Sequence, residues 1–206
     1  GLRDGFALPD YQHPRIDREV QRLTRSKHSL KMLLDRGKPY LDHILTSIED
    51  AGPPTEIALL PAVESGFRAH AYSPNGAAGL WQFMPATGQM LGLERNWWFD
   101  GRRDVVASTR AAIEYLTLLY ARFDGDWLHA LAAYNAGSGT VGRAIRRARQ
   151  QNQPTDFWSL DLPGETDAYV PRLLALVRVV NSPAAFGVTL PAVDYAPHFA
   201  VTETGG

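Results

Sequence analysis

The strongest constraint on the fold of this chain is helical periodicity in the near absence of strand patterns. Apolar residues recur at intervals of three and four positions, whereas alternating β-branched runs are missing. The strongest periodic segment runs from Asp104 to about Phe123, with Asp104 placed to cap it. Asp126 is placed to cap a second buried helix that ends at Gly137. Further helices are expected over residues 17–35, 39–50, 139–151 and 166–181. The sequence therefore predicts an all-α fold.

The chain has 206 residues, a length that suits one domain with extra arms. We expect an N-terminal helical arm at residues 1–38 that packs on the domain. The main domain is expected to span residues 39–190, with a break at Pro39 between two helices. An irregular tail is expected over residues 191–206. Because the chain begins with Gly1 rather than Met, we interpret it as a piece of a longer protein.

Composition excludes several classes of function. The formal net charge of −1 gives no electrostatic reason to expect nucleic acid, and no apolar run reaches membrane-spanning length. The absence of cysteine excludes disulfides, thiolate metal sites and a cysteine nucleophile. The histidines lack metal-ligand spacing, and no glycine-rich phosphate loop follows a strand. We therefore predict neither a metal ion nor an organic cofactor.

Glu64 is the main candidate for a catalytic group. Apart from Pro61, every residue from Ile57 to Val63 is apolar. Pro61 suits the first turn of a short helix, and Gly66 suits the left-handed position after its end. Apolar surroundings and a helix C-terminus both raise the pKa of a carboxyl group, as a general acid requires. A surface glutamate at the end of a core helix is the alternative interpretation.

Three later segments combine polar and aromatic side chains. The first has small residues around Gly79 followed by Trp81 and Gln82, a stacking face beside an amide that suits a sugar. The second places Tyr134 and Asn135 at a helix end before a glycine. In the third, Thr166 or Asp167 is placed to cap the last long helix, with Tyr169 in its first turn. Each segment alone is equally compatible with packing or capping.

Four sequence motifs are specific when they are taken together in the order in which they occur along the chain. They are Glu-Ser-x-Phe at Glu64, Gly-Leu-Trp-Gln at Gly79, Ala-Tyr-Asn-x-Gly at Ala133, and Glu-Thr-x-x-Tyr-Val at Glu165. This series resembles that of the family 1 lytic transglycosylases, and the likeness extends from about Pro39 to Gly187. Many members have Met at the position of Trp81. The Trp, with Leu-Leu-Pro before Glu64, is similar to the membrane-bound lytic murein transglycosylase D branch.

The resemblance implies a goose-lysozyme-like helical domain with a substrate groove at residues 39–190. It also implies that Glu64 is the sole catalytic acid/base. Glu64 would protonate the glycosidic oxygen between N-acetylmuramic acid and N-acetylglucosamine. It would then deprotonate the muramoyl 6-hydroxyl, which closes onto the anomeric carbon to give a 1,6-anhydro end without consuming water.

The resemblance also assigns roles to further residues. Tyr169 matches a position whose hydroxyl orients the catalytic carboxyl. Gln82 and Asn135 match substrate-contacting positions, and the backbone around Leu80 is expected to approach the sugars. The expected substrate-binding set is Ser65, Ser73, Gly79, Leu80, Trp81, Gln82, Tyr134 and Asn135.

Two alternatives stay open. A hydrolase on the same fold would use water instead of the 6-hydroxyl and would need a second carboxylate across the groove. A non-catalytic glycan-binding domain would keep the groove alone, although the joint presence of Glu64, Tyr169 and Asn135 argues against it. The arginines at 143, 146, 147 and 149 are interpreted as a solvated helix face.

By the same resemblance, the partner is the peptidoglycan glycan strand and the chain is expected to be a monomer. We expect a periplasmic location, with outer-membrane association through a lipid anchor upstream of this chain. Peptidoglycan-binding modules are expected to follow the C-terminal end. Nucleic acid is not expected as a partner.

Overall fold

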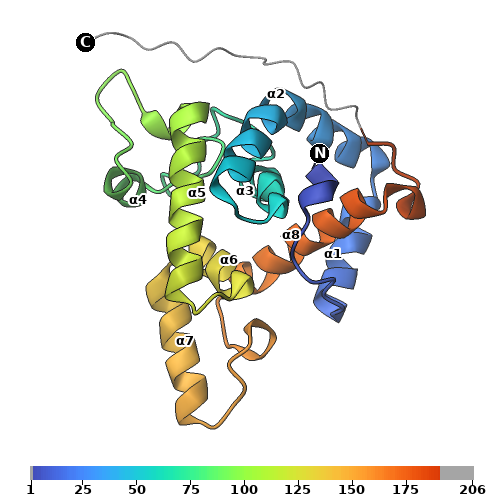
Figure 1. The fold of residues 1–206 in the computed structure, drawn as a ribbon, viewed down its shortest axis with the longest axis vertical. Helices are drawn as coiled ribbons and strands as arrows, with labels where there is room; N and C mark the ends of the chain where they lie inside the picture. The colour runs from blue at the N-terminus through green and yellow to red at the C-terminus, as the bar shows by residue number, and fades with distance from the viewer. Residues whose placement is uncertain (1, 191–206) are drawn as a thin grey trace.

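The computed structural model describes residues 2–190, and within this range helices are the only extended regular elements (Figure 1). Three isolated β-bridges connect residues in the loops between residues 72 and 100. The all-α prediction is therefore confirmed. The α-helices are α1 (Pro14–Thr24), α2 (Lys27–Ala51), α3 (Leu60–Glu64), α4 (Pro85–Met90), α5 (Val105–Arg122), α6 (Trp127–Ala136), α7 (Ser138–Gln150) and α8 (Gly164–Asn181). Short 3-10 helices cover Leu2–Gly5, Thr55–Leu59, Gly101–Arg103, Phe157–Ser159 and Pro183–Phe186.

Helices distant in sequence pack around one core. Helix α8 packs along α1 and also contacts α6, while α5 contacts both α2 and α6. In Figure 1 the short helix α3 lies between the long helices α2, α5 and α8. Its residues Leu60 and Pro61 are buried, and its C-terminal end carries Glu64. The longer helices therefore enclose the residues around the candidate acid.

Helix α2 differs from the sequence prediction. It runs without interruption through Pro39, so the predicted break between residues 35 and 39 is wrong. Buried apolar residues continue along one stripe on both sides of the proline, and their burial outweighs the hydrogen bond that proline removes. Gly37 lies on this stripe, where a Cβ atom would be 2.9 Å from the Phe67 ring. The boundary drawn after residue 38 therefore falls inside a single helix.

The N-terminal segment is fixed to the elements that carry the site. The buried carboxylate of Glu56 accepts hydrogen bonds from the backbone N–H groups of Ala7 and Leu8, at 2.9 and 2.7 Å. On α8, Arg178 donates to the Tyr11 carbonyl at 2.7 Å. Residues 2–12 thus connect the chain just before α3 to the last turn of α8. The predicted tail at residues 191–206 lies outside the described residues.

Two of the three helix caps predicted from the sequence are present in the structure. Asp104 accepts a hydrogen bond from Ala107 N–H at 2.7 Å, and Asp126 accepts one from His129 N–H at 3.0 Å, as predicted. The predicted cap at Thr166 or Asp167 is wrong, because α8 already begins at Gly164 and has no side-chain cap. Tyr169 consequently lies in the second turn of α8 rather than the first.

Candidate active site

Glu64 is the last residue of α3, as its local sequence predicts. Pro61 lies in the first turn, and Gly66 adopts a left-handed conformation with φ +61° after the helix end. The Pro61 carbonyl accepts hydrogen bonds from the N–H groups of Ser65 and Phe67, at 3.0 and 3.1 Å. This closed turn fixes the direction of the Glu64 side chain.

The Glu64 carboxyl group contacts a phenol from another helix. Tyr169, buried on α8, donates its hydroxyl hydrogen bond to Glu64 Oε1. Burial raises the pKa of Glu64 from 4.5 to about 8, while the Tyr169 hydrogen bond lowers it and the nearby charge of Glu165 raises it slightly. The desolvation effect dominates, so the carboxyl group stays protonated at neutral pH. That protonation state is the one a general acid needs.

Glu64 opens into a cleft of about 540 Å³. Ser73 and Gln82 line one side of this cleft, and Tyr134 and Asn135 of α6 line another. A separate hollow of about 560 Å³ lies beside Pro85 and Leu93, but its lining carboxylate, Glu94, is exposed. The cleft at Glu64 is therefore the candidate active site.

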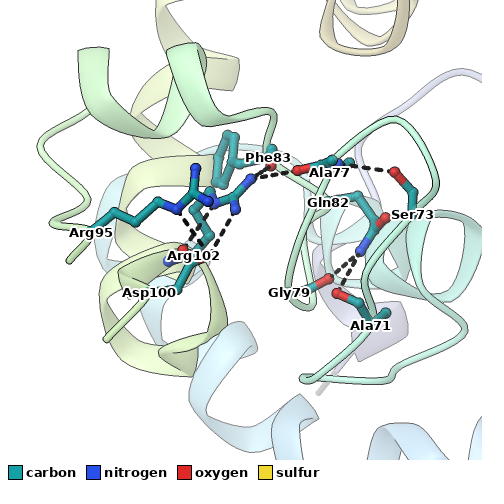
Figure 2. Close-up of polar contacts among 10 residues, drawn as sticks. Ala71, Ser73, Ala77, Gly79, Gln82, Phe83, Arg95, Asp100 and Arg102 are labelled. Carbon is teal, nitrogen blue, oxygen red and sulfur yellow. Dashed lines mark hydrogen bonds and ion pairs between the residues drawn. The ribbon is translucent and has the colours of Figure 1, made fainter. Parts of the chain in front are cut away.

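One side of the cleft is a loop that we call the cleft wall, residues 71–83. Its backbone is held by bridges from Ala78 to Tyr72 and Phe83. Gln82 has a left-handed φ of +51°, and its side-chain amide donates to the Gly79 carbonyl at 2.8 Å (Figure 2). Ser73 Oγ accepts a hydrogen bond from Ala77 N–H at 2.9 Å. The wall is therefore stabilised mainly by its own backbone and short polar side chains.

The inner part of the cleft wall is connected to the helices that form the rest of the site. Ser65 Oγ donates to the Leu80 carbonyl at 2.8 Å, and Tyr134 donates to the Trp81 carbonyl at 2.9 Å. Asn135 Oδ1 accepts a hydrogen bond from Thr166 at 2.8 Å. Within residues 2–190 the Asn135 amide nitrogen makes no hydrogen bond, so it is free to donate into the cleft.

Three residues of the expected substrate-binding set lie behind the cleft surface. The prediction that Trp81 offers a stacking face is wrong, because its indole is fully buried and donates to Thr109 at 3.0 Å. The Leu80 side chain is also buried. Gly79 packs against the backbone of Arg102, where a Cβ atom would lie 1.7 Å from the Arg102 carbonyl oxygen. The small and aromatic residues of this motif serve packing, and Gln82 is the motif residue that reaches the cleft.

Ser65 also has a different position from that expected. Its side chain is buried, donates to the Leu80 carbonyl and accepts from Arg68 N–H at 3.2 Å. It therefore connects the end of α3 to the cleft wall and does not face the substrate. Four members of the expected set, Ser73, Gln82, Tyr134 and Asn135, line the cleft together with Glu64, and their contact with the substrate stays a prediction.

The structure gives positions to two residues for which the sequence analysis proposed no role. Glu165, at the start of α8, is exposed and lines the same cleft as Glu64. Arg102 is buried behind the cleft wall and paired with Asp100. Glu165 opens the fourth motif, but its own side chain was given no role there, and Arg102 has no distinctive local pattern, since charged residues in turns are common on any surface.

Three further features of the described residues concern surface charge, metal binding and membrane spans. The α7 arginines 143, 146, 147 and 149 are all exposed, as predicted. Among residues 2–190, no group of acidic and histidine side chains is arranged to hold a metal ion. None of the described helices combines the length and apolarity required to cross a bilayer.

Comparison with known proteins agrees with this site. The Transglycosylase SLT domain matches residues 46–157, which contain Glu64, the cleft wall and α6. The chain belongs to the transglycosylase SLT family. It is 44% identical to membrane-bound lytic murein transglycosylase D of Escherichia coli K12 over 183 residues, which are 89% of this chain and 40% of that protein. The chain thus spans less than half the length of this relative.

Solved structures of the SLT family share the fold. The 70 kDa soluble lytic transglycosylase Slt70 of Escherichia coli superposes with a TM-score of 0.54 at 23% identity, covering 72% of this chain and 25% of that one. An inactive Glu-to-Gln mutant of the lytic transglycosylase Slt from Pseudomonas aeruginosa gives a TM-score of 0.50 at 22% identity, covering 71% and 24%. The family resemblance and the lysozyme-like fold inferred from the four motifs are thereby confirmed.

Proposed function

We propose that this chain is the catalytic part of a peptidoglycan lytic transglycosylase in which Glu64 is the sole acid/base. The observation that carries the proposal is a carboxyl group that accepts a hydrogen bond from Tyr169, has a pKa raised by burial and lines a polar cleft. Membership of the SLT family supports the reaction class. The relatives' names indicate murein as the substrate class.

The proposed reaction balances with one carboxyl group. Glu64 donates its proton to the glycosidic oxygen, and the bond from that oxygen to the anomeric carbon of N-acetylmuramic acid breaks. The carboxylate then accepts the proton of the muramoyl 6-hydroxyl as its oxygen bonds to the anomeric carbon. Glu64 ends protonated, water is not consumed, and the products are a 1,6-anhydromuramoyl end and a free 4-hydroxyl.

The surrounding residues have distinct proposed roles. Tyr169 orients the Glu64 carboxyl and stabilises its transient negative charge. The Asn135 amide nitrogen and the side chains of Ser73 and Gln82 contact the sugars from the cleft surface. Tyr134 lines the cleft while its hydroxyl holds the Trp81 carbonyl.

Hydrolysis is a second candidate because Glu165 lies in the cleft beside Glu64. An inverting hydrolase needs a second carboxylate that activates water. Glu165 is exposed, and a lytic transglycosylase does not need it. We therefore expect Glu165→Gln to keep the anhydro products and most of the activity, whereas loss of activity in this variant would favour hydrolysis.

Mass spectrometry of the soluble products from purified peptidoglycan tests the proposal. The wild-type chain should release anhydromuropeptides, and Glu64→Gln should reduce their rate of release by roughly 10²- to 10⁴-fold, the usual contribution of a general acid/base. Reducing-end muropeptides would establish a hydrolase instead. Products that are equal for the two proteins would remove Glu64 from the mechanism.

The cellular setting is also a proposal. The membrane-bound relative supports an envelope location. We propose a periplasmic protein associated with the outer membrane through an anchor outside this chain. We further propose that the catalytic part is monomeric and that peptidoglycan-binding modules occupy part of the remaining length. Fractionation of cells that express the full-length protein tests the location.

A further inference from the structure

Two sets of hydrogen bonds hold the backbone carbonyls of the cleft wall, and only one set includes a residue at the end of α3. Ser65, at the end of α3, and Tyr134 of α6 hold the carbonyls of Leu80 and Trp81, which we call the inner part of the wall. The carbonyls of Gly76 and Phe83, which flank that stretch in the sequence and which we call the outer part, are held by Arg102 instead. The position of the outer part therefore depends on a residue outside the proposed catalytic set.

Every nitrogen of the Arg102 guanidinium is used in this contact. Nη1 donates to the Gly76 and Phe83 carbonyls at 2.7 and 2.8 Å. Nε and Nη2 donate to the two carboxylate oxygens of Asp100 at 2.9 and 2.7 Å, and Figure 2 shows Asp100 beside the guanidinium. Asp100 thus fixes the plane of the group that holds both carbonyls.

The packing around Arg102 leaves no alternative position for it. Arg102 is 1% exposed. Its own backbone carbonyl lies against Gly79, where any larger residue would overlap it. Gly79 in turn accepts the Gln82 amide through its carbonyl at 2.8 Å. A single series of contacts therefore extends from Asp100 through Arg102 to the side chain of Gln82.

Arginine is required here because of its geometry. A buried charge is expensive unless it is paired and fully hydrogen-bonded, and Arg102 meets both conditions. Lysine keeps the charge but has no planar fork that could bind a carboxylate and two carbonyls together. Of the two carbonyls that Arg102 holds, that of Gly76 belongs to a partly exposed residue, whereas that of Phe83 is buried. Arg102 therefore supplies contacts to both carbonyls that lysine could not reproduce together.

We propose that Arg102, held by Asp100, is a positioning residue that fixes the outer cleft wall and thereby places Ser73 and Gln82 for glycan binding. This inference rests on the proposed function. Because Ser65 and Tyr134 hold the inner wall independently, Arg102 controls glycan affinity and leaves the chemical step at Glu64 unchanged.

Arg102→Lys tests the inference, with Arg103→Lys as the matched control. Arg103 is the adjacent residue, is exposed, and lies over the Tyr72 ring at 5.6 Å, a contact that lysine retains. On soluble glycan fragments, Arg102→Lys should raise KM roughly tenfold, the scale of a small misplacement of binding groups. It should change kcat less than about twofold and leave the high-pH limb of the activity profile in place. Arg103→Lys should leave both constants at wild-type values.

Hydrogen exchange gives a second readout that does not depend on catalysis. In Arg102→Lys, backbone amides of residues 76–83 should exchange faster, while those of α6 and α8 should keep wild-type rates. The affinity of Glu64→Gln for glycan fragments should fall roughly tenfold when Arg102→Lys is added.

The outcomes separate the two proposals. Unchanged KM, glycan affinity and wall exchange would overturn the positioning role. A fall in kcat with a shifted pH profile would also overturn it, because Arg102 would then act through Glu64. If the wild-type protein released no product, the proposed function would fail, and exchange and glycan affinity would still decide whether Arg102 fixes the wall.

Discussion

The two sides of the cleft are built in opposite ways. The side that carries Glu64 places a carboxyl group among apolar helix residues, with a single phenol as its partner. The opposite side, the cleft wall, is a network of backbone carbonyls and amides completed by a buried ion pair. Desolvation shifts the pKa on the first side, and hydrogen bonds fix the geometry on the second.

This difference separates chemistry from binding. Glu64 needs an environment that keeps it protonated, and full hydrogen-bond satisfaction would stabilise the charged form instead. The wall needs fixed donors and acceptors at the sugar, and four of its backbone carbonyls are accordingly held by side chains behind it. Substitutions on the two sides should therefore affect different measured quantities.

The largest expected effect in this comparison comes from Tyr169→Phe. The Tyr169 hydroxyl stabilises the charged form of Glu64 and lowers its pKa, so its loss should move the high-pH limb of kcat to higher pH. The maximal rate should fall roughly 10- to 100-fold, because the carboxyl group loses its orientation. A pH–rate profile against Tyr115→Phe, which also lines the cleft, checks this. If the high-pH limb of kcat stays in place in Tyr169→Phe, Tyr169 does not act on Glu64.

A smaller effect is expected on stability in Glu64→Gln. The folded-state pKa of Glu64 is raised from 4.5 to about 8, so folding favours the protonated form. Wild-type stability from this group is complete below about pH 4.5 and is lost as pH rises towards 8. The glutamine variant should thus gain about 1–3 kcal/mol over wild type near pH 8 and little at pH 4.

Urea unfolding at several pH values measures this gain. Glu114→Gln, at an exposed glutamate on α5, provides the matched variant measured under the same conditions. A gain for Glu64→Gln that stays constant with pH would contradict a raised pKa, since only titration of the group gives the slope.

The smallest expected effect on activity comes from Trp81→Phe. Trp81 lies behind the cleft wall, and its replacement removes the hydrogen bond to Thr109 and some buried volume. The free energy of unfolding should fall by about 1–3 kcal/mol while KM stays near wild type. Gln82→Ala, on the cleft surface, should instead raise KM and leave the free energy of unfolding near the wild-type value. A large KM for Trp81→Phe would place the indole in the substrate site after all.

Local signals explain what could be predicted from the sequence. Pro61 and Gly66 delimit α3, and Asp104 and Asp126 cap their helices through contacts within three residues. These features depend on neighbours in the chain, so their pattern is visible without the fold. The four motifs in order then indicated the family and its cleft residues.

The errors arise where tertiary packing decides. Pro39 signals a break locally, yet the buried stripe of α2 continues through it. Trp81 beside Gln82 suggests a sugar platform, but only the fold determines that one side chain is buried and the other lines the cleft. Arg102 stands among charged neighbours at residues 100–104, and nothing in that string reveals that it alone among the arginines there is buried.

Direct titration of Glu64 tests whether this carboxyl group is protonated at neutral pH. Side-chain ¹³C NMR of glutamate-labelled protein, with Glu64→Gln to assign the resonance, reports the protonation of this carboxyl group as pH rises. We expect a pKa of about 8 for Glu64 and a further increase in Tyr169→Phe. A pKa near 4.5 would contradict it, because Glu64 would then be ionised at neutral pH and could not donate the proton that starts the reaction.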